Sequence, residues 1–463
     1  MSQETTRSLT GDLLALMDVR PSEDDLAAAS LHLLDWLGCA LGGTTEPTGH
    51  AMAMASGCIA SEATHPLSPL GRSAPEVAWA LGSFGSLLEM DDVHRKAILH
   101  PGPVVMPAVL ACTTLASAHR AAEAVLRGYE AMIRLGCAVG QGHYAQFHNT
   151  ATCGGLGSAV AASWMLGLDV KQTQWAMAHA LSVSGGLWEC RNEPGATKHL
   201  HVAEAARRGV QAALAAEAGL AGPLRILEGA QGFFVGLAPD GKPEAILEGS
   251  LWAIHNTSFK PWPACRHTHP AIDAALALRA DLAAPELKGR MPDKIVIETY
   301  RDAVLFCDKP TPTDTAAARF SLQHAVAVAL YDGPPTLGAF ASEALDLPRY
   351  AELRGRVRVL QDASLTADYP AHYGARVSVQ IGKTILTQTI GDAWGDSENP
   401  MDAAAVVAKF DSLASWAGVT QMQAASLKDA ALDAAQGGGA GKLVQLMAAL
   451  TPTARTITEE LIK

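Results

Sequence analysis

The stretch FHNTATCGGLG, residues 147–157, continues directly into the small-residue segment SAVAASWMLGLD at residues 158–169. It places one histidine, His148, beside two threonines and three glycines. Glycines at this density let a backbone turn sharply or approach another group closely. A helix of small residues projects little bulk, so other helices must surround it closely. The stretch therefore predicts a buried helix that begins at a histidine, which is either a core residue or part of a site.

Helical patterns occupy both ends of the chain. Apolar residues recur at helical spacing from residue 11 to about residue 263, and helical patterns return after residue 400. The segment 47–73 is rich in Gly, Pro, Ser and Thr and is expected to form a loop. Because the chain becomes helical again at its end, we expect the tail to return to the first helical domain.

A different pattern lies between the two helical parts. Polar and apolar residues alternate at 294–300, 357–360 and 375–390, which predicts strands, with a hairpin at Gly382–Lys383. The fold class expected is therefore mainly α, with a large all-helical domain built from both chain ends and a smaller α+β domain inserted between them. The predicted boundaries are 1–263 and 393–463 for the helical domain and 264–392 for the α+β domain.

Composition narrows the class of function. The net charge is −12, from 35 Lys and Arg against 47 Asp and Glu, so no basic face predicts nucleic acid or an acidic membrane as a partner. The eight cysteines include no CxxC pair, which favours a reducing compartment. The N-terminus lacks a signal-peptide apolar region, and no run of 18 uncharged apolar residues predicts a membrane span. We expect a soluble, cytoplasmic protein.

Polar residues with catalytic chemistry gather in four segments of a chain that is otherwise poor in charge. Imidazoles can transfer protons near neutral pH, and lysines and arginines can hold carboxylates. The four clusters are Glu89, Asp91, Asp92, His94, Arg95, Lys96 and His100; His143, His148, Thr150 and Thr152; Lys198, His199 and His201; and Lys260, Cys265, Arg266, His267 and His269.

Each cluster also has a purely structural interpretation. Asp91 and Asp92 could cap a helix, and the segment around His201 could be an exposed loop. His267 and His269 could bind a metal, but no HExxH or CxxC motif accompanies them, so no metal is predicted. The sequence contains no GxGxxG motif opening a βαβ unit and no Walker A motif. These observations favour acid–base chemistry without a cofactor on a small anionic substrate.

The chain resembles the MmgE/PrpD family over nearly its whole length. The resemblance implies a large helical domain, a smaller α+β lid domain, a homodimer, and a site in the interdomain cleft without metal or organic cofactor. The matching segments, in order, are LLDWLGCALGG (33–43), SAPEVAWALGSFGSLLEMDD (73–92), HPGPVVMPAVLA (100–111), FHNTATCGGLGSAVAASWMLGLD (147–169), KHLHVAEAARRGVQAALAAEAGLAGP (198–223), KPWPACRHTHPAIDA (260–274), ARFSLQHAVAVALYDG (318–333) and GDAWGDSENPM (391–401).

The resemblance also implies roles for individual residues. The motif positions fall on Glu89, Asp91 and Asp92, His100, His148, Lys198 and Lys260. The chain departs from the family pattern at four positions. Glu89 stands where aspartate is usual, Val93 where threonine is usual, Cys265 where histidine is found, and His324 where tyrosine is common.

The resemblance also implies a reaction at a carbon next to a carboxylate, where fixed cations must stabilise the developing charge. The predicted catalytic residues are His148, His100, Lys198, Asp91 and Asp92. The predicted substrate-binding residues are Glu89, Thr150, His201, Lys260, Cys265, Arg266, His269 and His324.

Two missing hydroxyl groups guide the choice of reaction. Val93 and His324 replace the threonine and tyrosine of the dehydratase and decarboxylase branches, which favours an isomerase that epimerises an iminodisuccinate-type substrate. The alternative is a lyase similar to 2-methylcitrate dehydratase. A third alternative is a catalytically inactive binding homologue.

Overall fold

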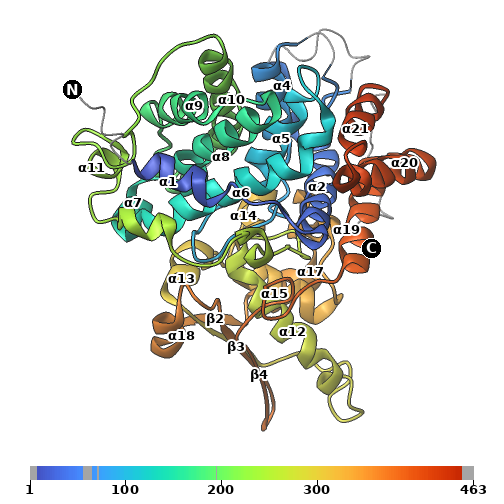
Figure 1. Cartoon of the computed structure of the whole chain (residues 1–463). Helices are drawn as coiled ribbons and strands as arrows, with labels where there is room; N and C mark the ends of the chain where they lie inside the picture. The colour runs from blue at the N-terminus through green and yellow to red at the C-terminus, as the bar shows by residue number, and fades with distance from the viewer. Residues whose placement is uncertain (1–7, 56–64, 70–71, 194, 451–463) are drawn as a thin grey trace. The chain divides into compact units, whose positions relative to one another are not determined.

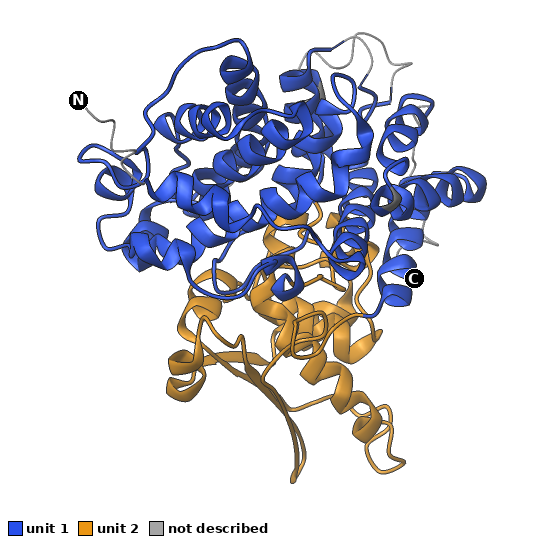
Figure 2. Ribbon diagram, in the orientation of Figure 1, with its two compact units in different colours: residues 1–87, 91–257, 402–455 blue, residues 88–90, 258–401, 456–463 orange. Residues whose placement is uncertain are grey.

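A computed structural model describes residues 8–55, 65–69, 72–193 and 195–450 (Figure 1). Contacts divide the chain into two compact units, coloured separately in Figure 2. Within the described residues, unit 1 takes the chain up to residue 87, then 91–257, and then residues from 402 onward. Unit 2 takes 88–90 and 258–401. The predicted domain boundaries near residues 263 and 393 stay predictions.

The regular secondary structure in the described residues of unit 1 consists of helices. Its longer helices are α1 (Leu9–Leu16), α2 (Glu23–Gly43), α3 (Pro47–Ala55), α4 (Ala74–Phe84), α5 (Gly102–Cys112), α6 (Ala121–Ala138), α7 (Gly140–Gln146), α8 (Asn149–Leu166), α9 (Val170–Ser182), α10 (Thr197–Glu217), α11 (Phe233–Leu237), α19 (Ala403–Trp416), α20 (Gln421–Leu432) and α21 (Gly439–Ala448). Short 3-10 helices are η1 (Ala118–Arg120), η2 (Trp188–Arg191), η3 (Pro243–Leu247), η4 (Ala253–Asn256) and η7 (Asp433–Gln436).

Helix α8 is the centre of unit 1 and contains the glycine-rich stretch. It packs against α5, α6, α9 and α10, as its lack of bulky residues predicts. The glycines make these approaches possible. A Cβ at Gly154 would lie 3.1 Å from side-chain atoms of α5 and α10, and one at Gly157 would lie 2.7 Å from the Gly128 carbonyl oxygen of α6. The close approach expected of these glycines is therefore an approach to neighbouring helices.

The two ends of the chain meet within unit 1. Helix α19 packs on α2, and a Cβ at Gly38 would lie 3.2 Å from the Phe410 Cα. Lys409 Nζ donates to Asp35 Oδ1 at 2.6 Å, and both side chains are buried. Among the described helices, α2 alone has the length and composition to cross a membrane, and 78% of its apolar window is buried. Such burial is typical of a core helix.

The segment 47–73 differs in part from the loop expected there. Residues Pro47–Ala55 form α3, and Gly49 packs closely against α2, because a Cβ there would lie 2.5 Å from the Gly43 carbonyl oxygen. The proline stands at the start of this helix, where its fixed φ is tolerated. Residues 56–64 and 70–71 lie outside the described residues.

Unit 2 contains a four-stranded sheet with the order β2-β1-β3-β4. Strands β1 and β2 are parallel, and the other neighbours are antiparallel. Its elements are η5 (Arg266–Thr268), α12 (His269–Leu282), β1 (Lys294–Thr299), α13 (Arg301–Cys307), α14 (Thr315–Arg319), α15 (Leu322–Tyr331), η6 (Leu337–Phe340), α16 (Ser342–Leu345), α17 (Pro348–Arg354), β2 (Val357–Gln361), α18 (Ala363–Asp368), β3 (Ala375–Ile381) and β4 (Thr384–Ile390).

The predicted strands are confirmed. Alternate residues of β1 and β3 are buried, and α12 packs on β3 and β4. The hairpin turns at Gly382, whose φ of 61° is accessible to glycine at little cost. The fold class, mainly α with a smaller α+β region, is confirmed by these elements.

Candidate functional site

His148 is the N-cap residue of α8 and is buried, with 2% of its surface exposed. Its backbone N–H donates to the Gly186 carbonyl at 2.9 Å, which ties the start of α8 to the loop before η2. Trp188 of η2 lies against the imidazole with ring centroids 4.4 Å apart, and the His201 ring lies 5.7 Å away. The predicted helix that begins at a histidine is therefore present, and its histidine faces other polar and aromatic groups.

The electrostatic environment keeps His148 neutral. Burial is the largest cause that lowers its pKa well below the usual value, followed by the positive charges of Lys198, His201, His100 and His199. Its Nδ1 is buried without a hydrogen-bond partner among the described residues, and so is the Nδ1 of His201. Buried polar atoms normally have partners, so these nitrogens point to a group that the polypeptide does not supply.

His100 lies in the segment that precedes α5, with its imidazole oriented by two acceptors. Its Nδ1 lies 2.8 Å from the Asp92 carbonyl oxygen and 3.1 Å from Asp91 Oδ2. Both partners accept, so Nδ1 carries the proton and Nε2 is the basic nitrogen of the neutral ring. The His100 N–H donates to Thr150 Oγ1 at 3.1 Å, which links this segment to the first turn of α8. The predicted orientation of a histidine by a neighbouring aspartate is seen for Asp91.

Asp92 is buried, and its carboxylate is held by three donors. His32 Nδ1 lies 2.8 Å away, Tyr129 Oη donates at 2.7 Å, and the Gly102 N–H donates at 2.9 Å. Gly102 begins α5, so Asp92 supports that helix end, in line with the capping alternative. These contacts make Asp92 a positioning residue for the loop that carries His100.

Lys198, His199 and His201 lie in the first turns of α10 rather than in a loop. Lys198 and His199 are half-buried, and His199 Nδ1 lies 2.9 Å from Ser86 Oγ of the segment after α4. Burial lowers the pKa of His201. The structure thus brings together five predicted residues, which we call the His148 cluster: His148, His100, Asp91, Lys198 and His201.

Two further predicted residues meet in unit 2. Lys260 is fully buried, and its Nζ lies 3.8 Å from Glu89 Oε2. Glu89 has a φ of 54°, which is unusual for a residue that is not glycine and stores backbone strain. Ile98, in the turn before His100, has a φ of 50°. Strain of this kind gathers at functional sites, so these two outliers support a role for the segment 89–100.

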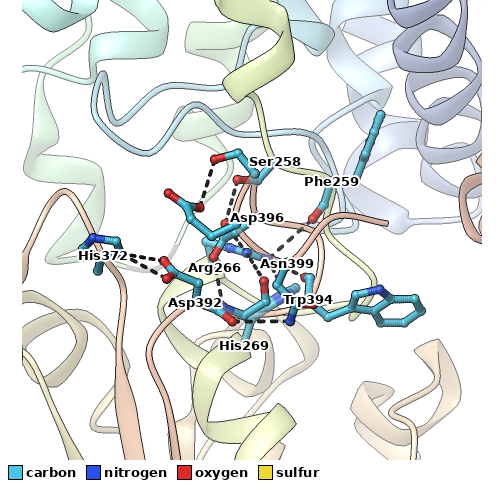
Figure 3. A network of polar contacts seen from close by, with 12 residues as sticks. Ser258, Phe259, Arg266, His269, His372, Asp392, Trp394, Asp396 and Asn399 are labelled. Carbon is cyan, nitrogen blue, oxygen red and sulfur yellow. Dashed lines mark hydrogen bonds and ion pairs between the residues drawn. The ribbon is translucent and has the colours of Figure 1, made fainter. Parts of the chain in front are cut away.

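Arg266 belongs to a buried network in unit 2 (Figure 3). Its guanidinium forms an ion pair with Asp396, which also accepts from Ser258 Oγ at 2.7 Å. Arg266 Nη1 lies 3.2 Å from His269 Nδ1, and His269 Nε2 lies 3.0 Å from the Ala264 carbonyl oxygen. The structure therefore places Arg266 and His269 in contacts that hold the segment around residue 396.

Cys265 and His324 are also buried in unit 2. The Cys265 N–H donates to the Arg319 carbonyl at 2.8 Å. His324 Nε2 donates to the Ala339 carbonyl at 2.8 Å, and Arg354 Nη1 donates to its Nδ1 at 3.0 Å. Burial is the main cause that lowers the pKa of His324 to about 4. Both ring nitrogens of His324 are thus used by the protein, and its predicted contact with substrate stays a prediction.

The histidine pair considered for a metal is arranged differently. His267 contacts Tyr300 Oη, and His269 is used as described above. Among the described residues, one exposed or half-exposed group has ligand atoms within 4.8 Å of one another: His372, Asp392 and Glu398. His372 Nδ1 lies 2.9 Å from Asp392 Oδ1, so this pair is already joined by an ion pair or hydrogen bond. The absence of a metal and of a cofactor stays a prediction.

Three residues around the His148 cluster were not predicted from the sequence. His32 and Tyr129 hold Asp92 from α2 and α6, which lie 60 and 37 residues away in the chain. No local pattern could reveal contacts at such separations. Trp188 gave a weak signal, because a tryptophan in the glycine-flanked loop GGLW, residues 185–188, is not needed for a helical core.

Similar proteins carry lyase names. The cis-aconitate decarboxylase of Mus musculus is 30% identical over 277 residues, which are 58% of this chain and 56% of that enzyme. The Homo sapiens enzyme of the same name is 29% identical over 352 residues, covering 71% of this chain and 70% of that enzyme. The 2-methylcitrate dehydratase of Escherichia coli (strain K12) is 27% identical over 220 residues, which are 46% of this chain and 45% of that enzyme.

These names contradict the predicted reaction class. Decarboxylases and dehydratases are lyases, so the prediction of an isomerase is wrong. The replaced hydroxyls at Val93 and His324 were the reason for that prediction. His324 is fully buried and hydrogen-bonded at both nitrogens, so the identity of this side chain was a poor guide to the reaction.

Two family models together cover most of the chain. The MmgE/PrpD N-terminal domain matches residues 18–246. The MmgE/PrpD C-terminal domain matches residues 262–433. The first match contains the whole His148 cluster. The second match contains Cys265 and Arg266, which follow Lys260 in the sequence, and helices α19 and α20. The chain belongs to the MmgE/PrpD family.

Proposed function

We propose that this chain is a lyase that removes water from a small hydroxy-tricarboxylate of the 2-methylcitrate type. The observation that supports this most directly is the buried, neutral His148, which lies near the charge of Lys198 and whose Nδ1 has no hydrogen-bond partner in the described part of the chain. A neutral imidazole can accept a proton, and a fixed ammonium group stabilises negative charge that develops on a carboxylate. The names of the relatives support the same reaction class.

The proposed mechanism uses residues of unit 1. His148 accepts the proton from the carbon next to a substrate carboxylate, and Lys198 stabilises the enolate-like charge that forms there. The electron pair of the broken C–H bond becomes the second bond between the two carbons. The hydroxyl on the neighbouring carbon leaves with a proton from His100 and becomes water. His100 delivers this proton from Nε2 after taking up a second proton, while Asp91 keeps the first one on Nδ1.

Decarboxylation is the second candidate, because the relatives of 29% and 30% identity are cis-aconitate decarboxylases. In that reaction the C–C bond to a carboxylate breaks, carbon dioxide leaves, and the electron pair takes up a proton. The same cations would stabilise the charge, and His148 or His100 would donate the proton. The two candidates thus differ in the bond that breaks, while the residues are shared.

The two reactions are separated by incubating the full chain with 2-methylcitrate, citrate and cis-aconitate. Dehydration gives an alkene that absorbs in the ultraviolet and a product lighter by one water in the mass spectrum. Carbon dioxide release from cis-aconitate, without dehydration of either hydroxy acid, would decide for the decarboxylase. Binding without turnover of any of the three substrates would decide for an inactive homologue.

The site assignment has its own test. We expect His148→Gln and Lys198→Gln each to lower kcat/KM by about 100-fold or more, because each removes a group that acts on the reacting atoms. His119→Gln and Lys171→Gln make the same chemical changes outside the His148 cluster and should leave kcat/KM unchanged. Unchanged kinetics in both cluster variants would show that the assignment is wrong.

Three other expectations accompany this proposal. We propose that the protein is a homodimer, which light scattering of the purified full chain would test.

We also propose that Lys260 binds a substrate carboxylate and that Glu89 orients this lysine. Lys260→Gln should therefore raise KM. Unchanged activity after exhaustive chelation would support the absence of a metal, and a reversible loss would contradict it.

A further inference from the structure

A pocket of about 560 Å³ lies in unit 1 between α9 and α10, which pack against each other (Figure 1). Its walls come from the solvent-facing side of α10, from the end of α9 and from the loop that follows α9. Of the His148 cluster, only His201 lines it. The proposed reaction therefore gives this pocket no role.

Arg208 is the charged group of the pocket with unused hydrogen-bonding capacity. Its Nη2 donates to the Ala151 carbonyl at 2.7 Å, but its Nε is buried without a partner among the described residues. A Cβ at Gly155 would lie 2.8 Å from that Nε, so the glycine gives the guanidinium its place against α8. Burial lowers the pKa of Arg208 to about 10, which still leaves it positively charged at neutral pH.

The other charges of the pocket cancel. Arg207 donates from Nε and Nη2 to the two carboxylate oxygens of Glu204 at 2.9 and 2.6 Å, so this pair has no net charge. Burial lowers the pKa of His201, whose ring is therefore neutral near pH 7 and whose Nδ1 has no hydrogen-bond partner within the described segments. One uncompensated positive charge remains, and a single carboxylate would balance it.

The rest of the pocket is apolar. Val183 and Leu200 are 66% and 47% exposed, and Ala212 and Ala215 continue the apolar wall along α10. Exposed aliphatic side chains around a concave surface gain free energy when an apolar group covers them. The pocket thus combines one cation with an apolar wall.

We propose that this pocket binds an organic monocarboxylate with an aliphatic body. The carboxylate pairs with the Arg208 guanidinium, and the aliphatic body covers Leu200, Val183 and Ala215. Such a ligand would lie against His201, the residue that the pocket shares with the His148 cluster. The pocket is therefore a second ligand site, which shares only His201 with the His148 cluster.

Octanoate is a suitable probe, with 1-octanol as the neutral ligand of the same length. We expect calorimetry with the full chain to give saturable octanoate binding at one site per chain and much weaker binding of 1-octanol. Arg208→Gln should weaken octanoate binding by about 10- to 100-fold, the usual effect of losing a charge-assisted contact. Arg358→Gln, the same change on an exposed strand residue of unit 2, should leave it unchanged.

Two further variants make the result specific. Ala215→Trp fills the pocket from a half-exposed position and should abolish octanoate binding even if Arg208→Gln does not fold. Lys198→Gln should retain octanoate binding, which separates this site from the catalytic one and keeps the two proposals independent. No saturable binding, including the case in which a second copy of the chain covers the pocket, would overturn the proposal. Equal binding of 1-octanol, or unchanged binding in both pocket variants, would overturn it as well.

Discussion

His148 combines burial with nearby positive charge, and both lower its pKa. The neutral, proton-accepting form therefore persists below the usual histidine pKa of about 6.5. If His148 is the base, we expect the acidic limb of the kcat/KM profile to lie below pH 6.5. Lys198→Gln removes one of the charges that lower this pKa, so the residual activity of that variant should have its limb at higher pH. A limb that stays in place in Lys198→Gln would contradict this electrostatic coupling.

His324 should make the protein less stable in mild acid. Its pKa in the folded protein is about 4, against about 6.5 in the unfolded chain, so the unfolded state binds more protons between these values. Its contribution is complete above pH 6.5 and is lost as pH falls toward 4. The loss between pH 7.5 and pH 5 should be about 2 kcal/mol. In His324→Gln, urea unfolding should show a pH dependence that is smaller by about this amount, and an unchanged dependence would contradict the prediction.

For individual residues, the sequence predicted which side chains carry chemistry better than it predicted which residues contact them. His148, His100 and Lys198 lie in recognisable segments, and the structure brings them close enough to interact electrostatically. The donors to Asp92 could not be predicted, since His32 and Tyr129 reach it only after α2 and α6 have packed. A titratable residue is visible in a sequence, but the partners that fix its role come from tertiary packing.

Among the helices, the contact between α8 and α10 sets the position of His148, which caps α8, relative to Lys198 and His201 of α10. A Cβ at Gly209 of α10 would lie 1.7 Å from Ser158 Oγ and 2.4 Å from the Ala159 backbone nitrogen of α8. Because backbone atoms cannot rotate away, Gly209→Ala must push the helices apart, at a cost of about 1–3 kcal/mol or more. Gly236→Ala is the matched control, since that glycine also lies in a helix and a Cβ there would meet nothing within 4 Å.

Urea unfolding midpoints measure this difference directly. We expect Gly209→Ala to lower the midpoint and Gly236→Ala to leave it unchanged or raise it slightly, because alanine favours helix over glycine. Equal midpoints for the two variants would show that α8 and α10 can separate at little cost. Gly209→Ala should also lower kcat/KM, since it shifts His148 relative to Lys198.

Elements with a clear local sequence pattern were predictable, and an element without one was not. The helix at 149–166 was predicted from its small residues and the strands of unit 2 from their polar–apolar alternation, and both patterns agree with the structure. Helix α3 has no such pattern, because PTGHAMAMA is rich in turn-forming and small residues. It forms where Gly49 allows it to lie directly on the end of α2, and that packing overrides the weak local preference.

On the scale of the whole molecule, the sequence identified the family and the fold class, but not the reaction. Segments that determine packing are spread over the full chain, so the fold could be inferred from many positions at once. The reaction depends on a few atoms around one substrate carbon. The isomerase prediction rested on the side chains at only two positions, Val93 and His324, and the lyase names of the relatives contradict it.

A buried ion pair links α2 to α19, near the two ends of the chain. Asp35 of α2 and Lys409 of α19 are 374 residues apart, and their side chains are 1% and 4% exposed. Burial raises the pKa of Asp35, and the charge of Lys409 opposes that shift. Lys409→Met should therefore lower the free energy of unfolding by about 3–5 kcal/mol, since it leaves a buried carboxylate without its cation.

The partner substitution separates this effect from a loss of packing. Replacing both residues, as Asp35→Leu with Lys409→Met, removes both charges and should recover much of the stability lost by Lys409→Met alone. Lys428→Met is the matched control, because Lys428 pairs with Asp411 at 3.0 Å on exposed surfaces of α20 and α19 and should cost less than about 1 kcal/mol. If Lys409→Met costs no more than Lys428→Met, the tail of the chain is held to α2 mainly by apolar packing, such as that of Phe410 against Gly38.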